Sequence, residues 1–395
     1  MESLIKKGIY DVGVQDWNIR DFHGYSTEKG TSYNAFLIVD EKIVLVDTVK
    51  KEFSDQLIRN ISKIVDPAKI DYVISNHTEM DHSGSIPRIM HIIGKDKPVY
   101  CSKLGEKALV AHFGDSFNFK AVENGEELNI GKRDLIFLET RMLHWPDSMF
   151  TYVKQDKVLF SSDAFGQHYA GFEKFDDQIS DSVLMPHAKK YFANILTPFS
   201  QKILKLISDV KALNLEIDVI CPDHGIYFRE NPLGIIEKYA KWAEQEPSHK
   251  ALVIYDTMWN STESMALAIC DGITSTGVNA VPMHARKWHR SDIQTEVLDA
   301  KALVFGSPTL NNGIFPTMAD VITYLKGLKP KNKIGASFGS FGWSGEAVKL
   351  LNADLTNMKV DLINEGLRMK YVPDHKVISQ CVEFGVEIGN AVKDS

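Results

Sequence analysis

The 395-residue chain contains few cysteines: there are four, and they lie far apart in the sequence. It has no CxxC pair of the kind that binds zinc or rubredoxin-type iron, and no spacing that indicates a disulfide framework. The sequence also has no long block of Lys and Arg. Its 45 basic residues are outnumbered by 52 acidic ones, which gives a formal net charge of −7. This charge predicts that the protein binds neither nucleic acid nor an anionic membrane.

Long apolar runs are absent as well. No stretch approaches the roughly 18 apolar residues that a transmembrane helix needs. Residues 1–13 are interrupted by Lys6, Lys7 and Asp11 and lack the apolar centre of a signal peptide. Hydrophobic residues make up 44% of the chain and charged residues 25%, which is ordinary for a globular protein. We therefore expect a cytoplasmic globular protein, and its chemistry must be inferred from motifs.

The sequence indicates one domain boundary. Residues 243–250 form a polar stretch with a proline, between an amphipathic run and an apolar strand pattern at 251–255. We expect one domain over residues 1–248 and a second over residues 249–395, both of ordinary domain size.

The two parts differ in their pattern of apolar residues. In the first part, helix-period segments lie between some of the short apolar runs at 35–39, 43–46, 72–74, 135–138, 158–160 and 217–220. This mixture predicts an α/β sandwich. In the second part, predicted strands at 251–255, 279–283, 302–305 and 333–337 alternate with predicted helices near 262–272, 292–299, 317–327, 344–357 and 375–392. Regular alternation predicts a doubly wound parallel sheet.

Candidate metal ligands occur where predicted strands of the first part end. One segment, residues 76–84, holds two imidazoles and two carboxylates within six residues, and three later strands each end close to a His or an Asp. Strand ends on one edge of a sheet converge, so these side chains are expected to meet. A single buried His more often satisfies a core hydrogen bond, but recurrence at four strand ends favours a metal site. The candidates are His77, Glu79, Asp81, His82, His144, Asp163 and His224.

The pattern HxExDH at 77–82, followed by His, Asp and His at wide spacings, resembles the metallo-β-lactamase superfamily. Glu79, where the hydrolases usually carry His, resembles the flavodiiron variant, and a carboxylate there makes a harder site suited to iron. The resemblance implies an N-terminal metallo-β-lactamase-like αββα sandwich and a C-terminal flavodoxin-like domain. It assigns one iron to His77, Glu79 and His144, a second to Asp81 and His224, and the bridge to Asp163. His82 binds metal in the hydrolases but usually turns away in flavodiiron proteins, so it is left out.

Other residues resemble family positions around the substrate cavity. His23, His168 and Tyr191 are candidates to donate a proton to a bound oxygen species; ordinary packing is the alternative. Asp47 and Asp223 either orient metal ligands or cap the ends of strands.

Three loops of the second part are rich in hydroxyl groups and glycine and follow predicted strands. They contain neither GxGxxG nor a Walker lysine motif, which argues against a dinucleotide fold or an NTPase. Together they resemble the FMN site of flavodoxins, with the phosphate at the start of a helix. The residues predicted to bind FMN are Thr257, Met258, Trp259, Asn260, Ser261, Thr262, Ser307, Pro308, Thr309, Leu310, Asn311, Asn312, Ser337, Phe338, Gly339, Trp343, Ser344 and Gly345.

The combination predicts an oxidoreductase in which electrons pass through FMN to two non-haem iron ions that reduce O2 to water, NO to N2O, or both. Without a cysteine-bearing rubredoxin segment, an external donor is expected: a rubredoxin first, a deazaflavin or a reductase as alternatives. The resemblance implies a head-to-tail homodimer, and a tetramer stays open. A metallohydrolase with a flavodoxin-like binding module and a diiron oxygen sensor are the competing functions. Glu79 argues against the hydrolase, and complete FMN loops argue against the sensor.

Overall fold

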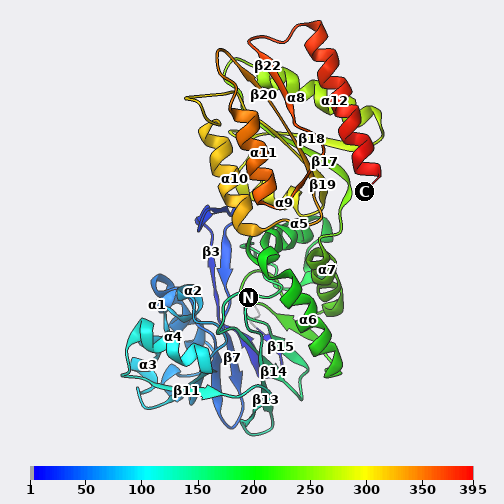
Figure 1. Cartoon of the computed structure of the whole chain (residues 1–395). Helices are drawn as coiled ribbons and strands as arrows, with labels where there is room; N and C mark the ends of the chain where they lie inside the picture. The colour runs from blue at the N-terminus through cyan, green and yellow to red at the C-terminus, as the bar shows by residue number, and fades with distance from the viewer. Residues whose placement is uncertain (1–3, 395) are drawn as a thin grey trace. The chain divides into compact units, whose positions relative to one another are not determined.

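The computed structural model describes residues 4–394, and the chain divides into two compact units (Figure 1). Unit 1 comprises the chain up to His23, Thr27–Phe192 and Phe199–Ala240. Unit 2 comprises the short segments Gly24–Ser26 and Ala193–Pro198 and the chain from Lys241. The transition from unit 1 to unit 2 at Lys241 lies close to the expected domain boundary, and the exact boundary between residues 248 and 249 stays a prediction.

Unit 1 contains two large sheets. The larger has the order β1-β2-β7-β8-β9-β10-β11, with β1 (Leu4–Lys6), β2 (Ile9–Asp11), β7 (Phe36–Val39), β8 (Ile43–Val46), β9 (Tyr72–Ser75), β10 (Pro98–Ser102) and β11 (Asn118–Val122). The smaller runs β12 (Glu127–Asn129), β13 (Asp134–Glu139), β14 (Met149–Val153), β15 (Val158–Phe160) and β16 (Val219–Cys221). The short strands are β3 (Val14–Asp16), which pairs with β6 (Thr31–Tyr33), and β4 (Asp21–Phe22) and β5 (Tyr25–Ser26).

Alternation along the strands builds the core between these sheets. Phe36 and Ile38 of β7 join the same buried cluster as Phe137 and Phe160 of the smaller sheet, and the Phe36 and Phe160 ring centroids lie 4.7 Å apart. Leu37, between them, faces the opposite side of the sheet and belongs to a second cluster. Each such side chain stabilises the fold by about 1.5–3 kcal/mol through burial.

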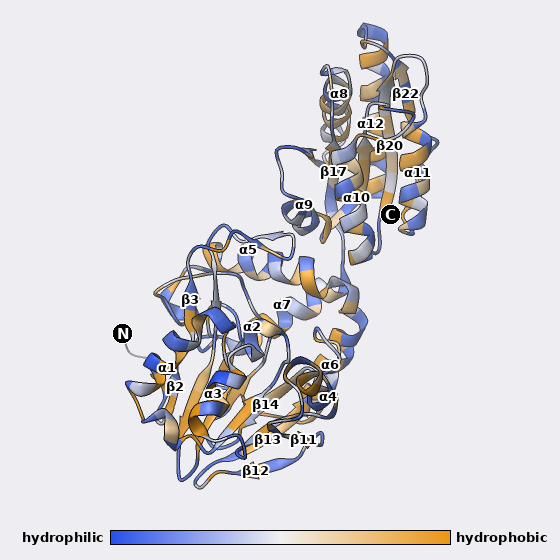
Figure 2. Ribbon diagram, turned by 90° about the vertical axis from the view of Figure 1, so that its left-hand side faces the viewer, coloured by the Kyte–Doolittle hydropathy of each residue, from blue (hydrophilic) through white to orange (hydrophobic). Residues whose placement is uncertain are grey.

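Helices cover the outer faces of both sheets (Figure 2). Buried residues of α1, α3 and α4 pack on the larger sheet, and Ile203 of α6 and Ile236 of α7 lie over Phe150 and Leu159 of the smaller one. The helices are α1 (Ser54–Ser62), α2 (Met80–Ser83), α3 (Ile86–Ile93), α4 (Lys103–Phe113), α5 (Asp181–Tyr191), α6 (Ser200–Ala212) and α7 (Pro232–Glu244). The short helical turns are η1 (Lys51–Phe53), η2 (Pro67–Lys69), η3 (Asp176–Gln178), η4 (Phe192–Leu196) and η5 (Thr197–Phe199). This αββα sandwich confirms the predicted fold of the first part.

Unit 2 is a doubly wound parallel sheet of order β18-β17-β19-β20-β21, with β22 paired to β20. Its strands are β17 (Ser248–Tyr255), β18 (Asn279–His284), β19 (Ala300–Gly306), β20 (Ile334–Phe341), β21 (Asp361–Leu362) and β22 (Leu367–Lys370). Its helices are α8 (Ser261–Ser275), α9 (Arg290–Val297), α10 (Pro316–Leu328), α11 (Ala347–Asn357) and α12 (His375–Lys393). Residues of α8 and α12 cover one face, and those of α9, α10 and α11 cover the other. The flavodoxin-like prediction is confirmed, and the order reverses between β17 and β19, where such sheets bind ligands.

Within residues 4–394, no helix combines the length and the apolar character that crossing a bilayer requires.

Candidate metal centre and cofactor loops

The structure brings the six predicted metal ligands together beyond strand ends of unit 1: five lie in loops, and Asp81 lies in the short helix α2. They form two groups in which the donor atoms lie within 4.8 Å of one another. The first group contains His77, Glu79, His144 and Asp163; the second contains Asp81, His82 and His224. The ligand loops follow β9, β13, β15 and β16, as the strand-end argument predicts.

Asp163 connects the two groups through its two carboxylate oxygens. Its Oδ2 lies 3.0 Å from His144 Nε2 and 3.4 Å from His77 Nε2 in the first group. Its Oδ1 lies 3.2 Å from His82 Nε2 and 3.4 Å from His224 Nε2 in the second. One buried carboxylate therefore presents one oxygen to each group, which is the arrangement of a bridging ligand.

The ring of His82, which the predicted ligand set leaves out, lies in the second group. Its Nε2 lies 3.3 Å from Asp81 Oδ2, and the ring is fully buried. His224 Nε2 lies at the same distance from that oxygen. The structure thus gives the second group two imidazoles and one carboxylate of its own, and the direction of the His82 ring is fixed by packing that the sequence does not reveal.

The donor set fits a cation. Asp81 Oδ1, Asp163 Oδ1 and both ring nitrogens of His82 are buried without a hydrogen-bond partner among the described residues. An orphaned buried polar atom costs free energy, and a metal ion satisfies several such atoms together. Imidazole nitrogens and carboxylate oxygens, with no thiolate, match iron rather than a soft thiolate-bound metal.

The pKa shifts of the ligand side chains also favour a bound cation. Burial opposes a charge on His77, yet hydrogen bonds to Asp147 and Glu79 raise its pKa well above the usual value. Burial likewise opposes a charge on Glu79, but hydrogen bonds from His144 and His77 hold the pKa of that carboxyl well below its usual range. The carboxylates thus draw positive charge into the centre, which protons supply when no metal does.

Residues behind the ligands fix their orientation. One oxygen of Asp147, Oδ2, lies 3.0 Å from His77 Nδ1 and accepts hydrogen bonds from the backbone N–H and the hydroxyl of Thr78. Asp47 instead anchors the ligand loop, because both of its oxygens accept hydrogen bonds from Asn76 at 2.7 Å. Asp223 Oδ2 lies 3.8 Å from His82 Nδ1. Asp147 was not predicted, although it lies only three residues beyond His144.

The three candidate pocket residues have different environments. The side chain of His23 is 76% exposed, and its Nε2 lies 3.6 Å from Glu79 Oε1. His168 and Tyr191 are buried with ring centroids 5.1 Å apart, and His168 Nδ1 lies 2.8 Å from Thr31 Oγ1. Burial lowers the pKa of His168 and raises that of Tyr191. His168 is therefore a neutral imidazole and Tyr191 a protonated phenol at neutral pH.

Unit 2 has a cavity of about 480 Å³ at the ends of β17, β19 and β20. Two indoles at its edge are largely exposed: Trp259 by 89% and Trp343 by 91%. The buried hydroxyl of Thr257, in the loop before α8, has no partner among the described residues. Exposed aromatic faces and a hydroxyl-bearing loop at a helix start fit a planar ring and a phosphate. The lining comprises Met258, Trp259, Ser261, Pro308, Thr309, Asn311, Asn312, Ser340, Phe341, Gly342, Trp343, Ser344, Tyr371 and Val372.

The remaining predicted FMN residues lie outside that lining and shape the loops. Thr262 and Ser340 hydroxyls lie 2.9 Å apart, and Ser307 Oγ accepts the backbone N–H of Phe315. A side chain at Gly339 would approach Ser307 O to 2.1 Å, so the close contact of these loops requires glycine. The others outside the lining are Thr257, Asn260, Leu310, Ser337, Phe338 and Gly345. The lining residues Tyr371 and Val372 were not predicted, because they follow β22, a strand that the sequence pattern does not reveal.

A buried carboxylate before the first loop was also not predicted. Asp256 accepts hydrogen bonds from Arg286 Nε at 2.9 Å and from the backbone N–H of Thr257 at 2.6 Å. Arg286 also donates to the carbonyl of Thr257. The pair therefore fixes the backbone on which the orphan Thr257 hydroxyl is presented.

Comparison with known proteins identifies both domains. Residues 31–225 match the family model described as ODP family beta lactamase, and residues 253–385 match the flavodoxin model. A nitric oxide reductase of Moorella thermoacetica is 46% identical, over 99% of this chain and 98% of the relative. The solved structure of rubredoxin oxygen:oxidoreductase from Desulfovibrio gigas has a TM-score of 0.97 at 42% identity, covering 100% of this chain and 99% of that one. The flavodiiron protein of Giardia intestinalis has a TM-score of 0.96 at 35% identity, covering 100% and 97%.

A β-lactamase-like metal domain followed by a flavodoxin domain defines a class of two-cofactor redox proteins. The chain belongs to the flavodiiron protein family. The predicted family and oxidoreductase class are confirmed, and the predicted cofactors, FMN and a diiron centre, are those of this family.

Proposed function

We propose that this protein takes electrons from an external donor and reduces O2 to water, NO to N2O, or both, at a diiron centre served by FMN. The observation that carries the proposal is the placement of Asp163, whose two oxygens face two separate groups of ligands. The names of the Moorella and Desulfovibrio relatives, a nitric oxide reductase and a rubredoxin oxygen oxidoreductase, support these two substrates.

The proposed ligands of the first iron are His77, Glu79 and His144, and those of the second are Asp81 and His224, with Asp163 between them. We add His82 as a ligand of the second iron, because its Nε2 points into that group. When bound, the irons and FMN supply the electrons and the site at which the gas is reduced. The protein holds the ligands apart at fixed positions, and Asp147 holds the His77 ring in one orientation.

Proton supply is assigned to side chains around the ligands. Tyr191 keeps its hydroxyl proton at neutral pH because burial raises its pKa. His168 is oriented by its contact with Thr31. His23 lies at the exposed edge beside Glu79, where it can exchange protons with solvent. These three residues are proposed as proton donors and the residues of the three loops in unit 2 as the FMN site.

The proposed donor is a rubredoxin, as the name of the Desulfovibrio relative indicates for that protein. We further propose a cytoplasmic head-to-tail homodimer, or a tetramer built from it. Light scattering of the purified protein tests the assembly, and a mass equal to one chain would contradict it.

The deciding experiment begins with protein whose iron and FMN contents have been measured. It is reduced without oxygen, and the consumption of O2 and of NO is then followed separately with gas electrodes. We expect at least one gas to be consumed repeatedly while donor is present. Failure to consume either gas would contradict the proposal, and zinc in place of iron would favour a hydrolase.

A further inference from the structure

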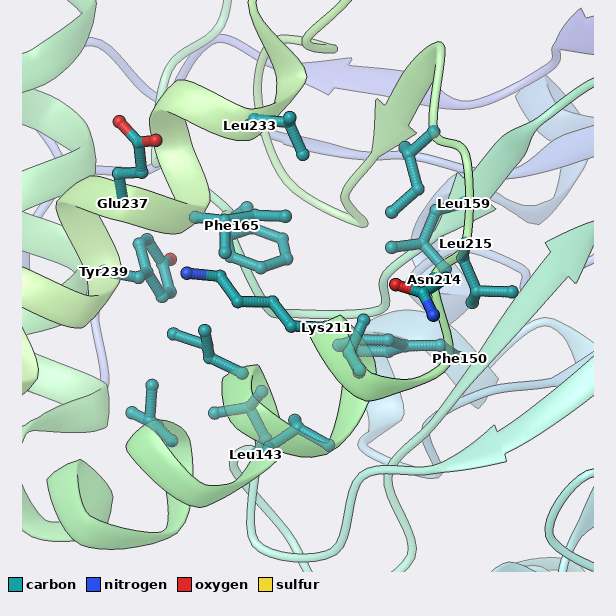
Figure 3. Close-up of a pocket in the computed structure, with 16 residues that line it drawn as sticks. Leu143, Phe150, Leu159, Phe165, Lys211, Asn214, Leu215, Leu233, Glu237 and Tyr239 are labelled. Atoms are coloured by element: carbon teal, nitrogen blue, oxygen red, sulfur yellow. The ribbon is translucent and has the colours of Figure 1, made fainter.

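Unit 1 has a cavity whose lining includes none of the proposed metal ligands. It measures about 350 Å³ and lies between α6, α7 and the outer face of the smaller sheet (Figure 3). Its buried lining is Leu143, Phe150, Leu159, Phe165, Ile203, Ile236 and Tyr239. In the view of Figure 3, Leu143, Phe150, Leu159 and Phe165 lie around the cavity, and the Lys211 side chain extends across it toward Tyr239.

The cavity is chemically suited to a small apolar molecule. Of its buried lining residues, Tyr239 alone has a polar side chain, and the charged Lys211 and Glu237 stand at exposed positions. A polar ligand needs well-placed hydrogen-bonding groups to orient it, and the buried lining of this cavity offers few such groups. Enclosed apolar cavities take up apolar guests such as xenon, and the buried end of this cavity offers the same kind of surface.

The floor of the cavity and the metal ligands share two loops. Leu143 is joined directly to His144, and Phe165 lies two residues beyond Asp163. The rings of Phe165 and Tyr239 contact each other with centroids 4.6 Å apart. An apolar wall thus backs the centre on this side, whereas His23, with a 76% exposed side chain, marks a polar and solvated side.

We propose that this cavity holds O2 or NO and supplies it to the metal centre past Leu143, Phe165 and Tyr239. The inference rests on the proposed function, because it takes the substrates to be small, uncharged gases. Such gases dissolve better in apolar surroundings than in water, so the cavity raises their concentration beside the centre. Protons and water use the solvated side, which separates their route from that of the gas.

The test places a large side chain in the cavity at two positions. Ile207→Trp fills the interior, and Leu233→Trp covers the mouth from α7 at a position that is 57% exposed and tolerates bulk. Leu213→Trp is the matched control, because Leu213 follows α6 and is 53% exposed without lining the cavity. Iron and FMN contents and melting temperatures are compared first.

Two measurements then test whether the cavity holds the gas, and neither requires continuous catalytic turnover. Crystals of the holoprotein under xenon pressure should show xenon in this cavity, and both cavity variants should lose it. The rate at which NO reacts with the reduced protein, followed by stopped-flow absorption, should fall about tenfold in both variants and stay unchanged in the control. Xenon absent from the cavity, unchanged rates in the plugged variants, or an equal loss in the control would overturn the inference. Reaction with NO but no continuing consumption of NO or O2 would instead contradict the proposed function, and the rate comparison would still decide the role of the cavity.

Discussion

At the scale of single residues, the centre depends on side chains that each face a defined partner. His144 approaches both Glu79 Oε2, at 3.2 Å, and Asp163 Oδ2, at 3.0 Å. Removing this imidazole leaves the first group with two carboxylates and one His, and both carboxylates lose a neighbour that balances their charge.

We therefore expect His144→Ala to lose iron while keeping FMN. Iron content should fall by about half or more, because binding free energy is spread over few ligands. Metal analysis and flavin absorbance of the same sample measure the two cofactors. His91→Ala, at an exposed position on α3, is the control. Full iron occupancy in the His144 variant would contradict the ligand assignment.

Asp147 acts on the metal through His77. In Asp147→Asn, the amide oxygen still accepts a hydrogen bond but carries no charge, so the imidazole is a weaker ligand. Residues in this position usually change metal affinity by about 10–100-fold. Competition with an iron chelator should show a loss of that size, while Asp55→Asn, on an exposed turn of α1, should show none. A loss equal in both variants would indicate a general effect on stability.

At the scale of elements, the loops after β17 and β20 present indoles to the cavity of unit 2. Trp343 is 91% exposed and lines that cavity. In Trp343→Ala, loss of its stacking surface should weaken FMN binding by about tenfold. Fluorescence titration of the apoprotein with FMN measures this change, and iron content should not change. Trp288→Ala, 44% exposed and outside the lining, should bind FMN normally; weakened binding there as well would contradict a local role for Trp343.

Much of the element order was predictable because apolar runs mark buried strands. Residues 36–39 and 43–46 became β7 and β8, and the alternation in unit 2 became its parallel sheet. The position of the metal loops followed from strand ends alone. The strand β14 (Met149–Val153) was not among the predicted strands, although apolar and aromatic residues make up most of its sequence.

Contacts between residues distant in the chain were not predictable. The pairing of Asp147 with His77 joins residues 70 positions apart, and the Asp256–Arg286 pair spans 30. The His82 ring direction depends on packing around it rather than on its motif. Resemblance gave the ligand types, whereas the direction of each side chain required coordinates.

At the scale of the whole molecule, stability should fall at alkaline pH. Burial raises the pKa of the Cys101 thiol to about 12, whereas an unfolded thiol has a pKa near 8.5. A raised pKa in the folded state stabilises the fold below the unfolded pKa, and this stability is lost as the pH rises toward 12. The loss is about 1.4 kcal/mol per pH unit for one such thiol.

The variant Cys101→Ala tests whether the Cys101 thiol lowers stability as the pH rises. The variant should be less stable than the unchanged protein at pH 8, because it loses buried sulfur. The difference in the free energy of unfolding should shrink as the pH rises to 10.5, because the variant has no thiol to titrate. Urea unfolding across this range measures the difference, and a constant gap would contradict the assignment.

The spread of the ligand loops along the chain has a consequence for biosynthesis. The donors are spread over residues 77–224, so no short segment of unit 1 holds them all. A nascent chain that has not yet produced β16 lacks the imidazole that completes the second group. Both irons can therefore be bound only after nearly all of unit 1 has been synthesised and its second sheet has formed, so full metallation reports the folding of unit 1, whereas the main part of unit 2, from Lys241 onward, is synthesised later.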